Sequence, residues 1–209
     1  MAAPRVLVLG GPSGAGKSRL ARRLHDRHGW PVVSLDDFYR EAGDLDLPMS
    51  PLGLPDWDDP RSWRLDDSVV ALEELCRHGS TTTPVYDIAA SRVTGTQQIV
   101  LDHHPVVLAE GIFALHVIEP LRRRGLLADA WCVRNRPWLT FGRRLLRDLA
   151  ERRKPPLTLW RRGHLLRQAE PGIVAEHVAL GSRAVTAREA EELSHQVVAR
   201  GRVSREGQR

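Results

Sequence analysis

The sequence predicts an α/β fold in which a doubly wound parallel sheet carries helices on both faces. Short apolar runs typical of buried parallel strands alternate with segments whose apolar residues recur at helical spacing. A glycine-rich turn joins the first apolar run to the first helical segment. With 209 residues, 42% hydrophobic side chains and no internal repeat, we expect one domain, residues 1–209.

The order of the expected elements follows from these runs and from the residues that interrupt them. We expect buried strands at 5–9, 31–35, 105–111 and 130–133. We expect helices at 18–28, from an Asp66 or Asp67 N-cap to His78, at 114–124, at about 138–153, near 158–169 and at 187–199. Residues 82–101 should form a small β insertion, a hairpin with Gly95 near its turn, and residues 170–172 should form a break. Thr186 and Glu189 have the spacing of a capping box at the start of the last helix.

The glycine-rich turn carries the first chemical signal. Residues 11–18 fit G-x-x-x-x-G-K-[ST], the phosphate-binding P-loop, between an expected strand and an expected helix. Backbone N–H groups must turn inward around the anion, which favours glycine, and the following helix N-terminus attracts the same charge. The fold is therefore of the P-loop NTPase type, with ATP as the expected cofactor. The predicted nucleotide-binding residues of this loop are Gly11, Pro12, Ser13, Gly14, Ala15, Gly16, Lys17, Ser18 and Arg19.

Carboxylates follow two of the expected strands. Asp36 and Asp37 come after the strand at 31–35, and Glu110 lies at the end of the strand at 105–111. The carboxyl ends of parallel strands form the crevice in which α/β sheets bind ligands. An aspartate there could take a proton from a substrate hydroxyl or hold Mg²⁺ through water, although aspartate also caps helices and turns. Glu110 has the place of a Walker B acid, so Ser18 and Glu110 are the predicted Mg²⁺ ligands.

A long loop over residues 41–63 is rich in Pro, Gly, Asp and Trp, and loops of this length are often functional. Its Asp56-Trp57-Asp58-Asp59-Pro60 segment places an aromatic plane beside carboxylates. This pattern could stack on a ring and hydrogen-bond a sugar, or it could be an acidic turn anchored by a core tryptophan.

The positive charge of the chain is local. Residues 134–167 hold eleven basic and two acidic side chains, whereas the rest of the chain is slightly acidic. An arginine-rich helix that ends at Pro155-Pro156 is consistent with a movable lid over phosphates, at about 138–160. RNA binding is the rival interpretation, and no RNP-type or helix-turn-helix signature supports it. We therefore expect a small-molecule substrate rather than a nucleic acid.

Composition also narrows the cellular context. No stretch approaches the roughly 20 apolar residues of a membrane span, and the first strand leaves no room for a signal peptide. Cys76 and Cys132 are unclustered, which suits a reducing compartment and gives no metal-site pattern. We expect a cytoplasmic protein without a membrane partner.

Five motifs in one order resemble the uridine kinase (uridine–cytidine kinase) branch of the P-loop kinases, close to phosphoribulokinase and bacterial pantothenate kinase. The resemblance covers roughly residues 5–155. Besides the P-loop, the motifs are Ser34-Leu35-Asp36-Asp37-Phe38-Tyr39-Arg40, Trp57-Asp58-Asp59-Pro60, Pro84-Val85-Tyr86-Asp87, Val107-Leu108-Ala109-Glu110-Gly111-Ile112 and Arg143-Arg144-Leu145-Leu146-Arg147-Asp148-Leu149-Ala150-Glu151-Arg152.

The resemblance implies a role for each matched residue. Asp36 would be the catalytic base, Asp58 would bind the ribose hydroxyls, and Tyr86 would lie against the nucleoside. The lid helix would bring Arg144, Arg147 and Arg152 to the phosphates and substrate, with Arg147 and Lys17 as catalytic residues. Arg92 and Lys154 complete the predicted substrate-binding set. Homo-oligomers are common in the family, so a homo-oligomer is expected.

The chain also departs from the family. After Pro-x-Tyr-Asp the family has a base-contacting His shortly before Ser-Arg, whereas here Ile88-Ala89-Ala90 precedes Ser91-Arg92 without one. The C-terminal Pro-Thr-Lys-Lys-Tyr-Ala-Asp stretch of the family has no counterpart. The expected activity is phosphorylation of a small-molecule hydroxyl, with the 5′-hydroxyl of uridine or cytidine as the first acceptor. The alternatives are another small alcohol (a sugar phosphate, a pantothenate-like compound or a modified nucleoside) and an RNA-associated NTPase.

Overall fold

The computed structural model describes residues 4–51, 53–134 and 171–203. The predicted helices at 138–153 and 158–169, and with them the predicted lid, lie outside the described residues. Within the described ranges, no helix is long and apolar enough to cross a membrane.

The core of the molecule is a five-stranded sheet in the order β2-β5-β1-β6-β7, and every pair of neighbours is parallel. Its strands are β1 (Arg5–Gly10), β2 (Val32–Ser34), β5 (Val106–Glu110), β6 (Leu127–Val133) and β7 (Arg183–Val185). The four apolar runs of the sequence thus form four of the strands, which confirms the predicted parallel sheet. The carboxyl ends of β1, β2 and β5 meet at one edge, because Ser34 and Leu9 both pair with Glu110.

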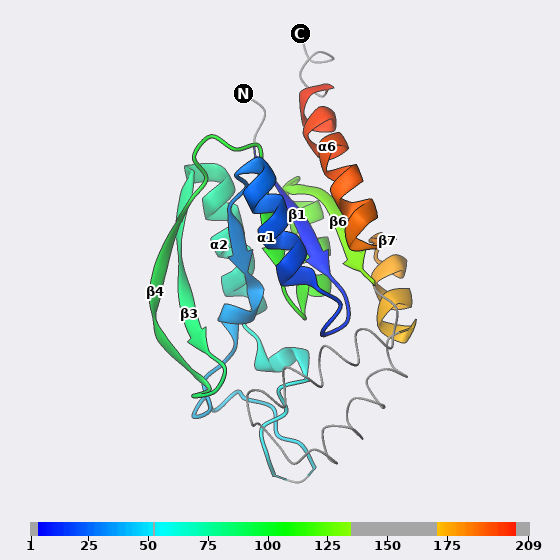
Figure 1. The fold of residues 1–209 in the computed structure, drawn as a ribbon. Helices are drawn as coiled ribbons and strands as arrows, with labels where there is room; N and C mark the ends of the chain where they lie inside the picture. The colour runs from blue at the N-terminus through cyan, green and yellow to red at the C-terminus, as the bar shows by residue number, and fades with distance from the viewer. Residues whose placement is uncertain (1–3, 52, 135–170, 204–209) are drawn as a thin grey trace.

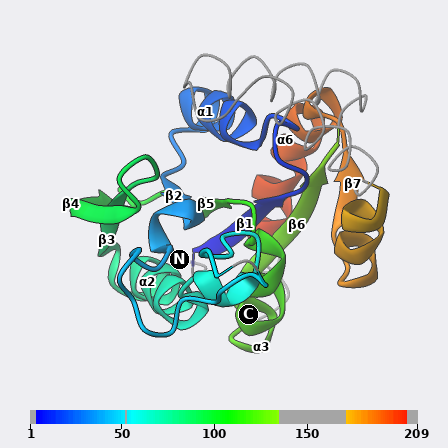
Figure 2. The same cartoon turned by 90° about the horizontal axis from the view of Figure 1, so that it is seen from below.

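Helices cover both faces of this sheet (Figures 1 and 2). Alternate residues of a strand point to opposite faces, so Leu7 and Leu9 belong to one apolar cluster and Val6 and Val8 to another. The first cluster lies beneath α1 (Lys17–His28) and α6 (Ala187–Val203), and the second beneath α2 (Leu65–His78), the 3₁₀ helix η3 (Ala114–Val117) and α3 (Ile118–Arg123). This arrangement confirms the doubly wound architecture.

The predicted β insertion is a separate antiparallel hairpin formed by β3 (Ser80–Asp87) and β4 (Arg92–Val100). The predicted turn at Gly95 is wrong, because Gly95 lies within β4 and pairs with Val85. The chain turns at residues 88–91, where one carboxylate oxygen of Asp87 accepts hydrogen bonds from the backbone N–H groups of Ala89 and Ala90 at 2.8 and 3.1 Å. An aspartate that binds its own turn determines the reversal here.

The start of α2 also differs from its prediction. Arg64 is the N-cap and no side chain caps the helix, so neither Asp66 nor Asp67 has that role. Both aspartates lie in the first turn, where a negative charge interacts favourably with the helix dipole. The predicted end is confirmed, because Gly79 adopts a left-handed conformation with φ of 81° after His78.

The C-terminal region holds one wrong prediction and one missed strand. Residues 171–179 are helical, so the predicted break at 170–172 is wrong for Pro171 and Gly172, while Glu170 lies outside the described residues. Packing of this segment, which includes the buried His177, outweighs the helix cost of about 1 kcal/mol for one glycine. β7 has only three residues, too few for a periodic signal. The capping box is confirmed, since Thr186 Oγ1 accepts from Glu189 N at 3.3 Å and the Glu189 carboxylate accepts from Thr186 N at 2.7 Å.

Candidate active site

The loop between β1 and α1 has the geometry of an anion cradle. Gly11, Gly14 and Gly16 adopt φ angles of 122°, 81° and 100°, which side chains with a Cβ rarely reach. A Cβ on Gly11 would also lie 2.5 Å from the carbonyl oxygen of Val133 on the neighbouring strand. The glycines therefore let the backbone curl against β6 and enter α1 at Lys17, with the helix N-terminus at the end of the curl.

Lys17 lies across this loop. Its ammonium donates hydrogen bonds to the carbonyl oxygens of Gly11 at 2.9 Å and Pro12 at 3.2 Å, and only 8% of the residue is exposed. A lysine held in this way places its positive charge at the position where the loop would receive phosphate oxygens.

Ser18, the next residue, joins the loop to β5. Its hydroxyl donates a hydrogen bond to Oε2 of Glu110 at 3.1 Å, although 92 positions separate the two residues. Burial raises the pKa of the Glu110 carboxyl, the neighbouring charges of Asp36 and Asp37 raise it further, and Lys17 and the Ser18 hydroxyl oppose these effects. This carboxylate would gain stability from a cation beside it.

A hydroxyl beside a carboxylate is an oxygen donor set that suits Mg²⁺. The described part of the chain contains no group of three or more His, Cys, Asp or Glu side chains that could hold a metal ion. Mg²⁺ does not need such a cage when phosphates are present, because it commonly binds one or two protein oxygens together with the phosphates and water. Ser18 and Glu110 therefore fit the ion that the sequence predicts.

The aspartates after β2 separate into two environments, which the sequence alone did not distinguish. Both lie in a short 3₁₀ helix, η1 (Leu35–Phe38). Oδ1 of Asp36 accepts a hydrogen bond from the backbone N–H of Ile112 at 2.9 Å, just past the end of β5. Gly111 makes this approach possible, because a Cβ there would lie 2.8 Å from Leu35 Cβ and 2.9 Å from Asp36 Oδ1. Asp36 is thereby placed beside Glu110 and the P-loop.

Asp37 turns toward the hairpin instead. Its Oδ1 accepts a hydrogen bond from the backbone N–H of Tyr86 at 3.2 Å. Burial raises the pKa of the Asp37 carboxyl, and the hydrogen bond from Tyr86 partly offsets that effect. Asp36 thus lies on the side of the P-loop and Glu110, and Asp37 on the side of the hairpin.

An aromatic cluster lies beside Asp36, and its centre, Tyr39, was not singled out from the sequence. The Tyr39 ring centroid is 5.8 Å from those of Tyr86 and Phe113 and 6.0 Å from that of Trp57. Burial raises the pKa of the Tyr39 hydroxyl, and the nearby charges of Asp36 and Asp58 add to the shift. An aromatic residue three positions after Asp36 was the available signal. The cluster forms an apolar wall beside Asp36.

The remaining predicted residues take different places. The hydroxyl of Tyr86 donates a hydrogen bond to the carbonyl oxygen of Arg40 at 2.9 Å. Asp58 is exposed and lies in a turn, where its backbone N–H donates a hydrogen bond to Asp56 Oδ1 at 3.2 Å. Arg19 on α1 and Arg92 on β4 are exposed. The structure thus brings together Lys17, Ser18, Asp36 and Glu110, with Asp58 and Tyr86 around Tyr39. The predicted lid residues Arg144, Arg147, Arg152 and Lys154 lie outside the described residues.

Sequence reasoning also missed His177, which packs against the start of the P-loop. This residue is 1% exposed, and the described residues offer its Nδ1 no hydrogen-bond partner. Its ring lies so close to Gly10 that a Cβ there would be 2.1 Å from Cε1. Burial, together with the nearby charges of Lys17 and His116, lowers the pKa of His177 to about 4. Through His177, the helical segment 171–179 packs against the end of β1.

We expect this buried histidine to make the protein sensitive to acid. Its pKa of about 4 lies below the ordinary value of 6.5, so between these values the unfolded chain binds a proton that the folded chain does not. The free energy of unfolding should therefore fall as pH falls from about 6.5 to 4, by roughly 1.4 kcal/mol per pH unit at most. Denaturant unfolding at several pH values measures the slope. His177→Gln should remove this part of the slope, and an unchanged slope in the variant would contradict the assignment.

Known proteins share both the sequence pattern and the fold. The AAA domain family model matches residues 6–103. Uridine kinase of Saccharomyces cerevisiae (strain ATCC 204508 / S288c) is 30% identical over 116 residues, which are 54% of this chain and 23% of that protein. The chain therefore spans about a quarter of the length of the curated relative that it matches.

Two solved structures have the same architecture. A candidate fructose transport system kinase from Silicibacter sp. TM1040 has a TM-score of 0.58 at 17% identity, over 89% of this chain and 90% of that chain. A candidate uridine kinase from Bacillus stearothermophilus has a TM-score of 0.50 at 18% identity, over 83% of this chain and 86% of that chain. These matches confirm the α/β fold. The resemblance to uridine kinase is confirmed by the yeast sequence match.

Proposed function

We propose that the protein is an ATP- and Mg²⁺-dependent kinase that transfers the γ-phosphoryl group to a hydroxyl of a small molecule, the 5′-hydroxyl of uridine or cytidine in the first instance. The observation that carries this proposal is the convergence of three strand ends. The P-loop after β1, Asp36 after β2 and Glu110 at the end of β5 meet in one place, joined by the Ser18–Glu110 and Asp36–Ile112 hydrogen bonds.

In the proposed reaction the chain supplies position and charge. The backbone of residues 11–16 and the ammonium of Lys17 would hold the donor phosphates. Ser18 and Glu110 would hold Mg²⁺, which would supply positive charge to the phosphate oxygens. Asp36 accepts the proton of the acceptor hydroxyl. The oxygen of that hydroxyl forms a bond to the γ-phosphorus, and the bond between the γ-phosphorus and the β–γ bridging oxygen breaks. ADP leaves with the bridging oxygen. The lid residues Arg144, Arg147 and Arg152 are proposed to spread the transition-state charge.

The acceptor is proposed to lie against the aromatic cluster. Tyr86 would contact its ring, Asp58 its vicinal hydroxyls, and Arg92 and Lys154 complete the contacts. The yeast sequence relative is a uridine kinase, which supports a nucleoside acceptor. The turn at 88–91 supports the alternative of another small alcohol, because it has no histidine to contact a pyrimidine. The candidate fructose transport system kinase among the structural neighbours fits that alternative.

A cytoplasmic location and a homo-oligomeric state belong to the same proposal. Cys76 and Cys132 are both buried and unpaired, which supports a reducing compartment. The homo-oligomer rests on the family resemblance.

Acceptor-dependent release of ADP tests the proposed activity. The purified protein should be incubated with ATP, Mg²⁺ and a panel of nucleosides, sugars and small alcohols. We expect turnover with uridine or cytidine and its loss, by at least a hundredfold, in Lys17→Ala, because one ammonium at the phosphates typically contributes a few kcal/mol to the transition state. Arg188→Ala on the exposed surface of α6 serves as a matched control that also removes one positive charge.

Each result leads to a definite conclusion. Turnover with another alcohol alone would transfer the proposal to that acceptor, and equal turnover in Lys17→Ala would reject the site. No acceptor-dependent ADP release with any compound of the panel, together with tight RNA binding that weakens steeply with salt, would favour the RNA-associated NTPase.

A further inference from the structure

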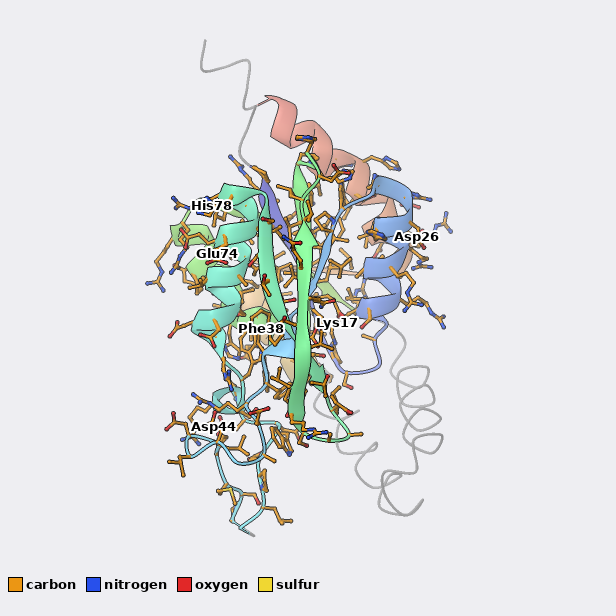
Figure 3. The ribbon with its side chains drawn as sticks, turned by 90° about the vertical axis from the view of Figure 1, so that its left-hand side faces the viewer. Lys17, Asp26, Phe38, Asp44, Glu74 and His78 are labelled. Carbon is orange, nitrogen blue, oxygen red and sulfur yellow. The ribbon has the colours of Figure 1, made fainter. Side chains whose placement is uncertain are left out.

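A groove of about 540 Å³ runs between α2 and the inner face of the β3–β4 hairpin, behind the segment that carries Asp36. Figure 3 looks onto this side of the molecule, where α2 with Glu74 runs alongside the hairpin and Phe38 lies between them. The groove is set apart from the P-loop, because none of residues 11–18 lines it. Its apolar surface comes from Phe38, Tyr39, Val70, Ala71, Pro84 and Val93, so the groove shares Tyr39 with the aromatic cluster.

Four carboxylates, those of Asp37, Glu41, Asp67 and Glu74, line this groove. Three of them use an oxygen to hold the hairpin: Asp37 accepts from Tyr86 N at 3.2 Å, Glu41 from Val93 N at 2.8 Å, and Glu74 from the Thr81 hydroxyl at 3.0 Å. Asp37 also accepts a hydrogen bond from the Ser34 side chain, whereas Glu41 and Glu74 each have a second carboxylate oxygen. A concave wall concentrates the negative potential of such groups.

The positive charge in the groove does not balance these carboxylates. Arg64 is the single basic side chain among the described lining residues, and its guanidinium lies 3.8 Å from a carboxylate oxygen of Asp44, which is not part of the lining. The groove therefore favours a cation and disfavours phosphate or carboxylate ligands.

Thr83 is the second, independent sign of a ligand. It lines the groove and is 1% exposed, and its hydroxyl has no hydrogen-bond partner in the described structure. Buried hydroxyl groups are nearly always hydrogen-bonded, so an exception on the wall of a groove indicates a partner that arrives from outside.

We propose that this groove binds a small alkyl diamine or polyamine, whose ammonium groups pair with the carboxylates while its methylene chain covers the apolar surface. An ammonium has three donors, enough to reach carboxylate oxygens and a threonine hydroxyl together. Because Asp37, Glu41 and Glu74 connect the groove to three places along the hairpin, the bound ligand fixes the hairpin against α2. The proposal goes beyond the kinase function and does not depend on it.

Calorimetric titration of the full-length protein with spermidine, in the absence of ATP and Mg²⁺, tests the site. We expect saturable binding with one ligand per chain. The double variant Asp67→Asn/Glu74→Gln should weaken it at least tenfold, and Thr83→Val should weaken it several-fold. The matched control is Asp66→Asn/Glu73→Gln, which removes the same two charges from α2 at residues that do not line the groove. This control should leave the affinity for spermidine within twofold of the parent.

The outcomes separate this site from its rivals. Equal weakening in the control pair would show diffuse attraction to an acidic surface and overturn the proposal. Equal binding of hexane-1,6-diol would exclude recognition of charge, and saturable Mg²⁺ binding that depends on Asp67 and Glu74 without spermidine binding would make this an inorganic cation site. Thermal unfolding of each variant verifies its fold. The titration should be repeated with Lys17→Ala, which is expected to lack kinase activity. Unchanged affinity for spermidine in this variant would show that the groove binds its ligand independently of that activity.

Discussion

Replacing Asp36 with asparagine is expected to lower kcat by a factor of about 10² to 10⁴ while ATP affinity stays within a few-fold of the parent. An asparagine oxygen can still accept the hydrogen bond that Ile112 N donates to Oδ1, so the geometry of η1 should persist. What the variant loses is the capacity to accept a proton from the acceptor hydroxyl. Steady-state kinetics with saturating ATP measure kcat, and equilibrium titration measures ATP affinity.

Asp37 provides the comparison, because it lies next to Asp36 in the same short helix but directs its carboxylate to Tyr86 N. Asp37→Asn should leave kcat within a few-fold of the parent, because the asparagine oxygen can still accept from Tyr86 N and the hairpin keeps its place. Near-normal kcat in Asp36→Asn, or a larger loss of kcat in Asp37→Asn, would remove Asp36 from the role of base.

The second large effect is expected from Gly10→Ala. A Cβ at this position would lie 2.1 Å from Cε1 of His177 and 3.0 Å from both ring nitrogens, and the ring is fully enclosed. Since the φ of Gly10 is not in the positive range, the backbone tolerates alanine and the conflict is with the ring alone. We expect a loss of roughly 2–3 kcal/mol in the free energy of unfolding. ATP binding should also weaken, because Gly10 leads directly into the P-loop.

The steric origin of this effect can be checked by relieving it. Gly10→Ala/His177→Ala should recover part of the lost stability relative to Gly10→Ala, since the second change opens the space that the new methyl group needs. Gly95→Ala is the control, because no atom lies within 4 Å of the Cβ that it adds. Denaturant unfolding compares the four proteins. If Gly10→Ala is as stable as the parent, His177 does not pack as described.

Sequence reasoning predicts correctly those parts of the fold whose signals lie within one short segment of the chain. β1 and β5 are continuous apolar runs because both faces of a central parallel strand are buried. The capping box needs only the four residues from Thr186 to Glu189. Glycines at positive φ define the P-loop within eight residues, so its position is predicted without any tertiary contact.

The errors concern interactions between distant parts of the chain, or local signals that compete. Gly95 is a local turn signal, yet the pairing of β3 with β4 places it within a strand, opposite Val85. The separation of Asp36 from Asp37 depends on Gly111 and Ile112, more than 70 residues away. A three-residue strand such as β7 has no pattern of its own, because its conformation comes from pairing with β6.

The place of β7 has a consequence for the synthesis of this protein. Trp131 and Val133 of β6 are buried in the cluster that also contains Val185, Ala190 and Val197. While the ribosome is still translating the residues between β6 and β7, β6 therefore presents an unpaired backbone edge beside exposed aromatic and aliphatic surface. This combination promotes association between nascent chains. The central sheet lacks its fifth strand until β7 has emerged, so a polypeptide stalled before residue 183 should require chaperone protection that a chain containing β7 and α6 does not.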